Sequence, residues 1–171
     1  MNLSSNISSR RSVRQYKEGA EVSKEQVHSL LEAAMHAPSA CNTRPWEFIV
    51  IRNRELLNKI ADNHPHAKML STASLAILVC ALPEVQSGIS DGFFPQDCGA
   101  ATQNILLQAA EMELGSCWCG VYPKEPLIAK IKEILNLPEN STPFNIIAIG
   151  VADGELKQRG FYEGEKVRYM N

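Results

Sequence analysis

The chain has 171 residues, of which 44% are hydrophobic, and this predicts one packed domain over residues 1–171 rather than a disordered segment. The formal net charge of −2 and the pI of about 6.1 argue against nucleic acid as a partner, because nucleic-acid binding usually requires a basic face. No apolar run reaches the ~18 residues of a membrane span, and residues 1–9 lack the apolar stretch of a secretory signal, so we expect no membrane partner and a cytoplasmic location.

Patterns typical of helices and strands alternate along the chain. Ser23 and Gln26 form a predicted capping box, and the apolar spacing after them predicts an amphipathic helix that ends before Pro38. Further helices are expected at 55–61, at 97–114 with Gly115 as its C-terminal cap, and at 127–135 with Pro126 near its first turn. Strands are expected at 47–51, 75–82, 116–121 and 144–151, and a loop at 83–95.

This alternation indicates a layered α/β or α+β domain. By itself it would favour parallel strands, and it does not determine their order. The strand at 75–82 is apolar throughout, which is typical of a strand buried on both faces. After Asp153 the chain is polar and charged and has no core of its own.

A cluster of three arginines and a serine lies near the N-terminus: Arg10, Arg11, Ser12 and Arg14. Arginine carries planar, permanently charged donors that match the oxygens of a phosphate, and serine adds a hydroxyl donor. In an otherwise acidic chain this cluster indicates a phosphate site, and the alternative is a solvated basic arm.

A second candidate segment, residues 37–46, lies between a helix and a strand and contains two stiffening prolines. Asn42 offers both a donor and an acceptor, which suits the edge of a heteroaromatic ring. The alternative is a turn between core elements, anchored by Trp46.

A third candidate, residues 115–121, contains glycines that would let the backbone approach a ligand closely. Cys117 and Cys119 would share one face of a strand, but their spacing is not the Cys-x-x-Cys of redox pairs or zinc sites. The other cysteines and the four histidines show no ligand spacing either, so we expect free, buried thiols and no metal site. In the tail, Lys157, Arg159, Lys166 and Arg168 form a fourth candidate; the alternative is a solvated end, which we expect for Lys166 and Arg168.

Taken in order, these segments resemble the nitroreductase family. Arg-Arg-Ser-x-Arg-x-Tyr at 10–16 is similar to its flavin phosphate motif, and Pro-Ser-x-x-Asn-x-x-Pro-Trp-x-Phe at 38–48 to its second motif. Residues 96–107 and the following Leu-Gly-Ser-Cys-Trp-x-Gly at 114–120 resemble its central helix and next strand. Ile149-Gly150, leading to Lys157 and Arg159, resembles its C-terminal end, so the match covers nearly the whole chain.

The resemblance implies an α+β fold, a three-layer α-β-α domain with a mostly antiparallel central sheet. It also implies a homodimer with two FMN sites at the interface, each FMN bound tightly but not covalently. Residues 153–171 would then be a C-terminal extension that packs on the partner subunit.

The resemblance also implies site residues. Arg10, Arg11, Ser12 and Arg14 would hold the phosphate and ribityl chain, helped by Lys157 or Arg159. Pro38, Ser39 and Asn42 would approach the flavin ring from the partner subunit, and the backbone of Cys119 and Gly120 would face its reactive nitrogen. No catalytic acid or base is expected.

Two positions depart from the family or vary within it. Arg44 stands where the family often has glutamine, and arginine cannot accept a hydrogen bond, although its charge could stabilise negative charge on a reduced flavin. The variable insert of the family is reduced to residues 83–95, which suggests Phe93 and Phe94 as a substrate lid.

The implied function is a ping-pong oxidoreductase that passes electrons from NAD(P)H through FMN to a small electron acceptor, such as a nitroaromatic or a quinone. No Gly-x-Gly-x-x-Gly follows a strand, so a nicotinamide would bind without a dinucleotide fold of its own. The alternatives are a flavin-binding sensor or carrier without turnover, and a specialised flavin enzyme on the same fold, either a dehalogenase or a flavin-fragmenting enzyme. A module that binds only through its basic arm is a further alternative.

Overall fold

The computed structural model describes residues 3–157, 160 and 162–170, and the following elements are those found within them. The α-helices are α1 (Ser5–Ser9), α2 (Lys24–Met35), α3 (Arg54–Asn63), α4 (Phe94–Glu111) and α5 (Glu125–Leu135). The strands are β1 (Trp46–Ile51), β2 (Leu75–Ala81), β3 (Gly115–Gly120) and β4 (Thr142–Gly150). Every strand and helix expected from the sequence is present, with bounds that differ by a few residues.

The strands form one sheet in the order β1-β2-β4-β3, and each neighbouring pair is antiparallel. The parallel pairing favoured by the alternation of elements is therefore wrong, and the mostly antiparallel sheet implied by the resemblance is confirmed. Alternation says only that a helix lies between two strands; the path of the connection decides the direction in which the next strand enters the sheet. As expected, β2 is buried along its whole length.

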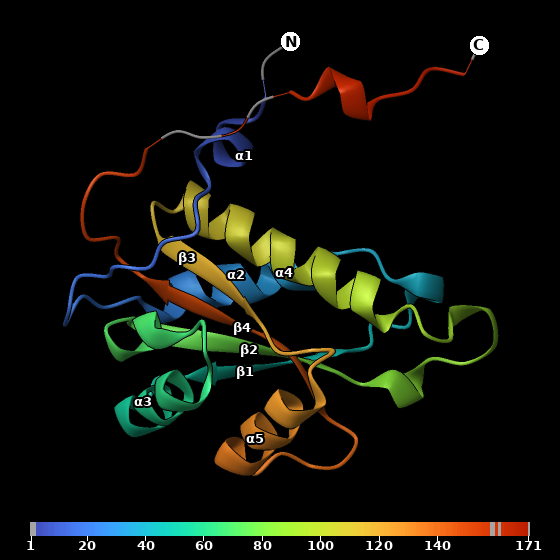
Figure 1. The fold of residues 1–171 in the computed structure, drawn as a ribbon, viewed down its shortest axis with the longest axis horizontal. Helices are drawn as coiled ribbons and strands as arrows, with labels where there is room; N and C mark the ends of the chain where they lie inside the picture. Colours follow the sequence, from blue (N-terminus) through green and yellow to red (C-terminus); the bar gives the residue numbers. More distant parts are fainter. Residues whose placement is uncertain (1–2, 158–159, 161, 171) are drawn as a thin grey trace.

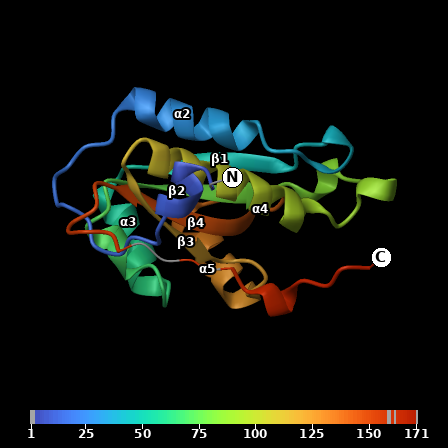
Figure 2. The ribbon, with the colours of Figure 1, turned by 90° about the horizontal axis from the view of Figure 1, so that it is seen from above.

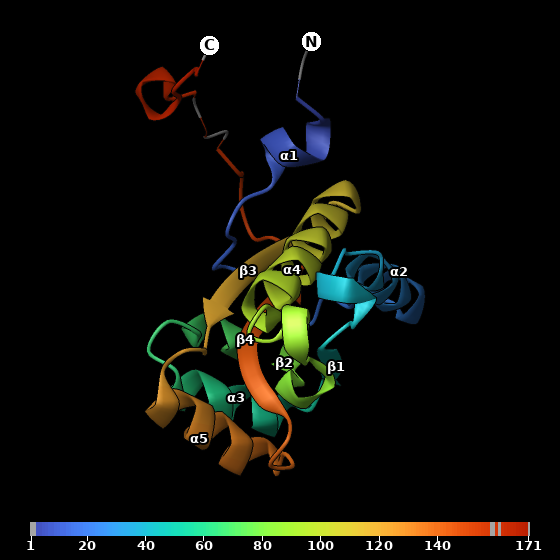
Figure 3. The ribbon, with the colours of Figure 1, turned by 90° about the vertical axis from the view of Figure 1, so that its right-hand side faces the viewer.

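Helices cover both faces of the sheet, which confirms the three-layer α-β-α arrangement. Figures 1 and 3 show α2 and α4 on one face and α3 and α5 on the other. The hydrophobic core is correspondingly divided into two clusters, one on each side of the sheet. Fully buried Ile105 of α4 belongs to one cluster, and fully buried Leu57 of α3 belongs to the other.

The ends of the helices follow local chemistry, with one exception. The capping box is confirmed, because Gln26 N donates to Ser23 Oγ at 3.2 Å and Ser23 N donates to Gln26 Oε1 at 2.9 Å. Gly115 does not cap α4 as expected: the helix ends at Glu111, and Glu113 takes the left-handed conformation with φ of 57°. Gly115 instead begins β3, where an added Cβ would lie 2.9 Å from a methyl carbon of Val13.

The N-terminal segment runs along the outer edge of β3. Ser12 forms a parallel bridge with Ser116, and Val13 N donates to Ser116 O at 2.9 Å. The chain after β4 stays close at first, since Asp153 N donates to Gln15 O at 2.9 Å. Residues 162–170 then lie away from the sheet, on the side of α1, as Figures 1 and 3 show, and Figure 2 shows them on the side of the molecule opposite to α2. Along the described part of the chain, no helix combines the length and apolarity that crossing a membrane requires.

Candidate functional site

A basic groove lies where the N-terminal arginines meet the chain that follows β4. It has a volume of about 620 Å³ and is lined by Arg10, Arg11, Ser12, Arg14, Glu155, Leu156, Lys157 and Gly160. Four of these side chains are cationic and one is anionic, so the groove is a strongly positive region on an acidic protein. It brings together the first and fourth segments singled out in the sequence; Arg159 lies outside the described residues.

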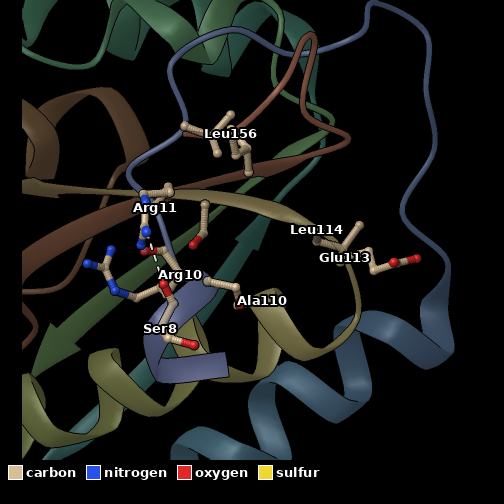
Figure 4. Close-up of a pocket in the computed structure, with 10 residues that line it drawn as sticks. Ser8, Arg10, Arg11, Ala110, Glu113, Leu114 and Leu156 are labelled. Carbon is tan, nitrogen blue, oxygen red and sulfur yellow. Dashed lines mark hydrogen bonds between the residues drawn. The ribbon is translucent and has the colours of Figure 1, made fainter. Parts of the chain in front are cut away.

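A second cavity, of about 420 Å³, opens beside the groove at the C-terminal end of α4. Figure 4 shows Arg10 and Arg11 on one side of it and Ala110 and Leu114 on the other. The N-terminal segment therefore lies against the C-terminal end of α4, and this contact places the basic groove at that end of the helix.

The arginines of the groove differ in the hydrogen bonds that their guanidinium groups make. Arg11 Nε donates to Lys157 O at 2.7 Å and its Nη2 donates to Ser8 O at 2.9 Å, and it also bonds the carbonyl of Arg10. Arg11 thus ties α1 to the tail. Arg14 is exposed, and its Nη1 lies 3.4 Å from Ser12 O, which is a long hydrogen bond. The guanidinium of Arg14 is therefore better placed than that of Arg11 to bind an anion.

A third cavity, of about 310 Å³, continues from Arg14 along β3. Its lining comprises Arg14, Pro65, His66, Lys68, Met69, Cys117 and Trp118. Lys68 begins the short turn η2 (Lys68–Ser71) and adds a cation that the sequence analysis missed. No pattern near Lys68 predicts this role, because only the packing of η2 near β3 brings Lys68 to this cavity.

Gly120, the last residue of β3, faces open space. A Cβ added there would meet no atom within 4 Å. At Gly150, by contrast, an added Cβ would lie 2.8 Å from a ring carbon of Tyr16. The protein's own packing therefore requires glycine at 150 but not at 120, which leaves room for a ligand to approach the backbone of Gly120.

The two cysteines of β3 face the core on the α3 side of the sheet, as expected for residues two apart on a strand. The hydrogen bond from Cys119 lowers the pKa of the Cys117 thiol to about 7, with help from the charges of Arg14 and Arg10. The same bond, together with burial, raises the pKa of Cys119. All five cysteines are free, as expected; four are buried, but Cys41 is exposed because it lies on a surface loop.

The second candidate segment forms a loop around the short turn η1 (Ala40–Asn42). Ser39 Oγ accepts from Arg44 N at 2.9 Å, and Arg44 Nε donates to Asn42 Oδ1 at 3.2 Å. Asn42 and Arg44 both have positive φ, at 56° and 51°, and so does Cys41 at 50°. Three non-glycine residues in this sparsely populated region require support from the surrounding structure.

That support comes from a buried polar network at the start of α4. Asp97 is 6% exposed; its Oδ1 accepts from Ala40 N at 3.1 Å and its Oδ2 accepts from Gln86 Nε2 at 2.8 Å. Gln86 Nε2 also donates to Thr43 Oγ1 at 3.2 Å. The sequence does not predict these roles for Asp97 and Gln86, although an aspartate in the first turn of a helix is a recognisable signal.

The loop at 38–44 and the basic groove lie at opposite ends of α4. The helix has 18 residues, which corresponds to about 27 Å at 1.5 Å per residue. One chain therefore does not bring Pro38, Ser39, Asn42 and Arg44 together with Arg10, Ser12 and Arg14. The candidate lid residues also lie near the loop: Phe93 is 41% exposed, and Phe94 packs edge-on against Tyr122 with ring centroids 5.3 Å apart.

No group of three or more histidine, cysteine or acidic side chains able to hold a metal ion occurs among the residues for which the structure gives positions. The donors of the groove are instead guanidinium, ammonium and hydroxyl groups, which bind phosphate oxygens.

Comparison with known proteins identifies relatives over most of the chain. A family model described as "Nitroreductase family" matches residues 7–74 and 63–151. A protein of Archaeoglobus fulgidus named "Putative NADH dehydrogenase/NAD(P)H nitroreductase" is 43% identical over 159 residues, which cover 93% of this chain and 88% of the relative.

Solved structures agree with this match. An FMN-dependent nitroreductase from Clostridium difficile superposes with a TM-score of 0.89 at 33% identity, covering 97% of this chain and 98% of the other. A Desulfovibrio desulfuricans structure described as "a putative nitroreductase in complex with fmn" has a TM-score of 0.81 at 28% identity, covering 97% and 95%.

Proposed function

Because the chain belongs to the nitroreductase family, we propose that it is an FMN-dependent oxidoreductase that passes electrons from NAD(P)H to nitroaromatics, quinones or similar small electrophiles in a ping-pong sequence. When bound, FMN would supply the redox chemistry, taking two electrons from the nicotinamide and passing them to the acceptor. The chain's own residues bind and orient the cofactor.

The observation that carries this proposal is that Arg14 lines both the basic groove and the cavity beside β3. Arg10, Arg14 and Lys157 offer charged donors to a phosphate at one end. Arg14 and Lys68 line the adjoining cavity, which leads along β3. Gly120 lies at the end of that strand and leaves open space where a planar ring can approach the backbone. A phosphate, a polyhydroxyl chain and a ring in sequence fit this arrangement.

The proposal includes a homodimer. The loop at 38–44 lies about one helix length from the groove of its own chain, so a complete site needs the loop of a second copy. The outward side of α4 supports an interface, because Ala100, Leu107 and Ala110 are only partly buried in the single chain. Residues 153–171 would pack on the partner, which accounts for a tail without a core. Light scattering should give a dimer, and a stable FMN-loaded monomer would contradict this part of the proposal.

The absorbance spectrum of the purified protein tests the cofactor. We expect a yellow protein with about one FMN per subunit, released by denaturation and absorbing at roughly 450 nm. Oxidation of NAD(P)H in the presence of menadione or nitrofurazone then tests turnover. A folded protein that takes up no FMN would refute the proposal, and one that binds FMN without turnover would support a sensor or carrier instead.

A further inference from the structure

A buried histidine is bonded to the backbone at the end of β3. His64 follows α3 and is 2% exposed. Its Nε2 lies 3.0 Å from Gly120 O, and its Nδ1 accepts from His66 N at 3.1 Å. A neutral imidazole has one donor and one acceptor. Since Nδ1 accepts, Nε2 carries the proton and donates it to the carbonyl of Gly120.

The surroundings favour this neutral form. Burial lowers the pKa of His64 and outweighs the hydrogen bond to Gly120 O, which raises it; the nearby His66 lowers it further. Protonation would also place a hydrogen on Nδ1, directly against the N–H of His66, and would break that bond. A single tautomer is therefore compatible with both hydrogen bonds.

The peptide that His64 holds lies on the open edge of the sheet. Val13 N bonds Ser116 O from outside β3, so the polar backbone groups of Ser116 point outward. Residues alternate along a strand, so Gly120, four positions later, has the same orientation. The N–H and C=O of one residue in an antiparallel strand point to the same edge. His64 therefore occupies the outward carbonyl of Gly120, and the N–H of the same residue points to the same outer edge of β3.

A second contact fastens the same two segments. Cys119 Sγ lies 3.4 Å from His66 O, next to the bond between His64 and Gly120. The turn at 64–66 is thus held to the end of β3 at two adjacent residues. The same turn contributes His66 and Pro65 to the cavity that Arg14 and Lys68 line. The bond from His64 consequently sets the position of the Gly120 peptide relative to this cavity.

We propose that His64 is a positioning residue for the cofactor: through its bond to Gly120 O it aims the Gly120 N–H at the reactive nitrogen of the flavin ring. The inference rests on the proposed function, since it assigns His64 to the same site. His64 touches no reacting atom, and it acts only through the peptide of Gly120.

Two conservative substitutions distinguish the two hydrogen bonds of His64, the one to Gly120 O and the one from His66 N. In His64→Gln the side-chain amide nitrogen lies near the position of Nε2, so the donor to Gly120 O is kept. In His64→Asn the amide oxygen lies near the position of Nδ1, so the acceptor for His66 N is kept and the donor to Gly120 is lost. His64→Leu removes both bonds, and His28→Gln, at an exposed position on α2, is the control.

The measurements are the rate of flavin reduction by NAD(P)H, the reduction potential of the bound flavin, and the amide NMR signal of Gly120 in the apoprotein. We expect His64→Gln to stay within about twofold of the wild-type rate, and His64→Asn and His64→Leu to lose about tenfold, as for one hydrogen bond. The potential and the Gly120 signal should change in the same two variants and not in His64→Gln or His28→Gln.

Two results would overturn the inference. One is an unchanged rate and potential in all three variants with reduced thermal stability, which would make His64 purely structural. The other is an equal loss in His64→Gln and His64→Asn. A wild-type protein that binds no FMN would refute the proposed function instead, and the Gly120 signal in the apoprotein would still decide whether His64 holds that peptide.

Discussion

Replacing Arg14 with alanine should remove most of the preference of the protein for FMN over riboflavin, which lacks the phosphate. Arg14 is exposed, lines both the basic groove and the cavity along β3, and makes a long hydrogen bond to Ser12 O. Its loss should therefore appear in ligand binding and not in the stability of the fold.

The magnitude follows from the charge of both partners. A hydrogen bond to a charged group contributes about 1.5–3 kcal/mol, and about 1.4 kcal/mol corresponds to a factor of ten, so FMN should bind roughly 10- to 150-fold more weakly. Because the groove is open to solvent in the single chain, screening favours the lower half of that range. Binding of riboflavin should change by less than about twofold, since it offers no anion to Arg14.

Titration of both ligands into the apoprotein, followed by the quenching of flavin fluorescence, measures the ratio of the two affinities. Arg11→Ala is the matched control, because Arg11 bonds the carbonyls of Ser8, Arg10 and Lys157 and its loss should weaken both ligands together and lower the unfolding temperature. Circular dichroism should remain native in Arg14→Ala. An affinity ratio unchanged from wild type would remove Arg14 from the phosphate site.

Three further predictions concern the strand end, the loop support and acid stability. Gly120→Ala should leave the unfolding temperature unchanged and weaken the binding of FMN at least about tenfold. Gly150→Ala, whose Cβ would lie 2.8 Å from a ring carbon of Tyr16, should lower the free energy of unfolding by about 1–3 kcal/mol in urea; a larger loss of stability in Gly120→Ala than in Gly150→Ala would contradict the open space at Gly120. Asp97→Ala leaves the buried side-chain amide of Gln86 without its carboxylate partner, so it should lower stability by about 2 kcal/mol and weaken the binding of FMN. An FMN affinity equal to that of the wild type would show that the loop at 38–44 does not need support from Asp97. Burial lowers the pKa of His64 below its ordinary value of 6.5, so the unfolded chain binds the proton more readily and the protein loses stability as the pH falls below about 6.5. Urea denaturation between about pH 5 and 7 should show a smaller loss of stability in His64→Gln than in the wild type; the same dependence of stability on pH in both proteins would refute the assignment of this loss to His64.

The sequence by itself determined the positions of the regular elements and the chemical character of the N-terminal arginines. The capping box at Ser23 and the continuous apolar run at 75–82 are read correctly because each depends on residues a few positions apart. The order of motifs along the chain was also sufficient to identify the family, and with it the antiparallel sheet that the alternation of elements did not predict.

Only the tertiary structure decided which distant residues meet. Gly115 was expected to cap a helix, but its small size serves the packing of Val13, about a hundred positions earlier in the chain. Lys68 and His64 reach the edge of β3 only because η2 and the end of α3 pack there, and Gln86 supports a loop more than forty residues before it. Local patterns record the conformation of neighbouring residues, whereas these contacts depend on the path of the whole chain through the three layers, and no short-range signal encodes that path.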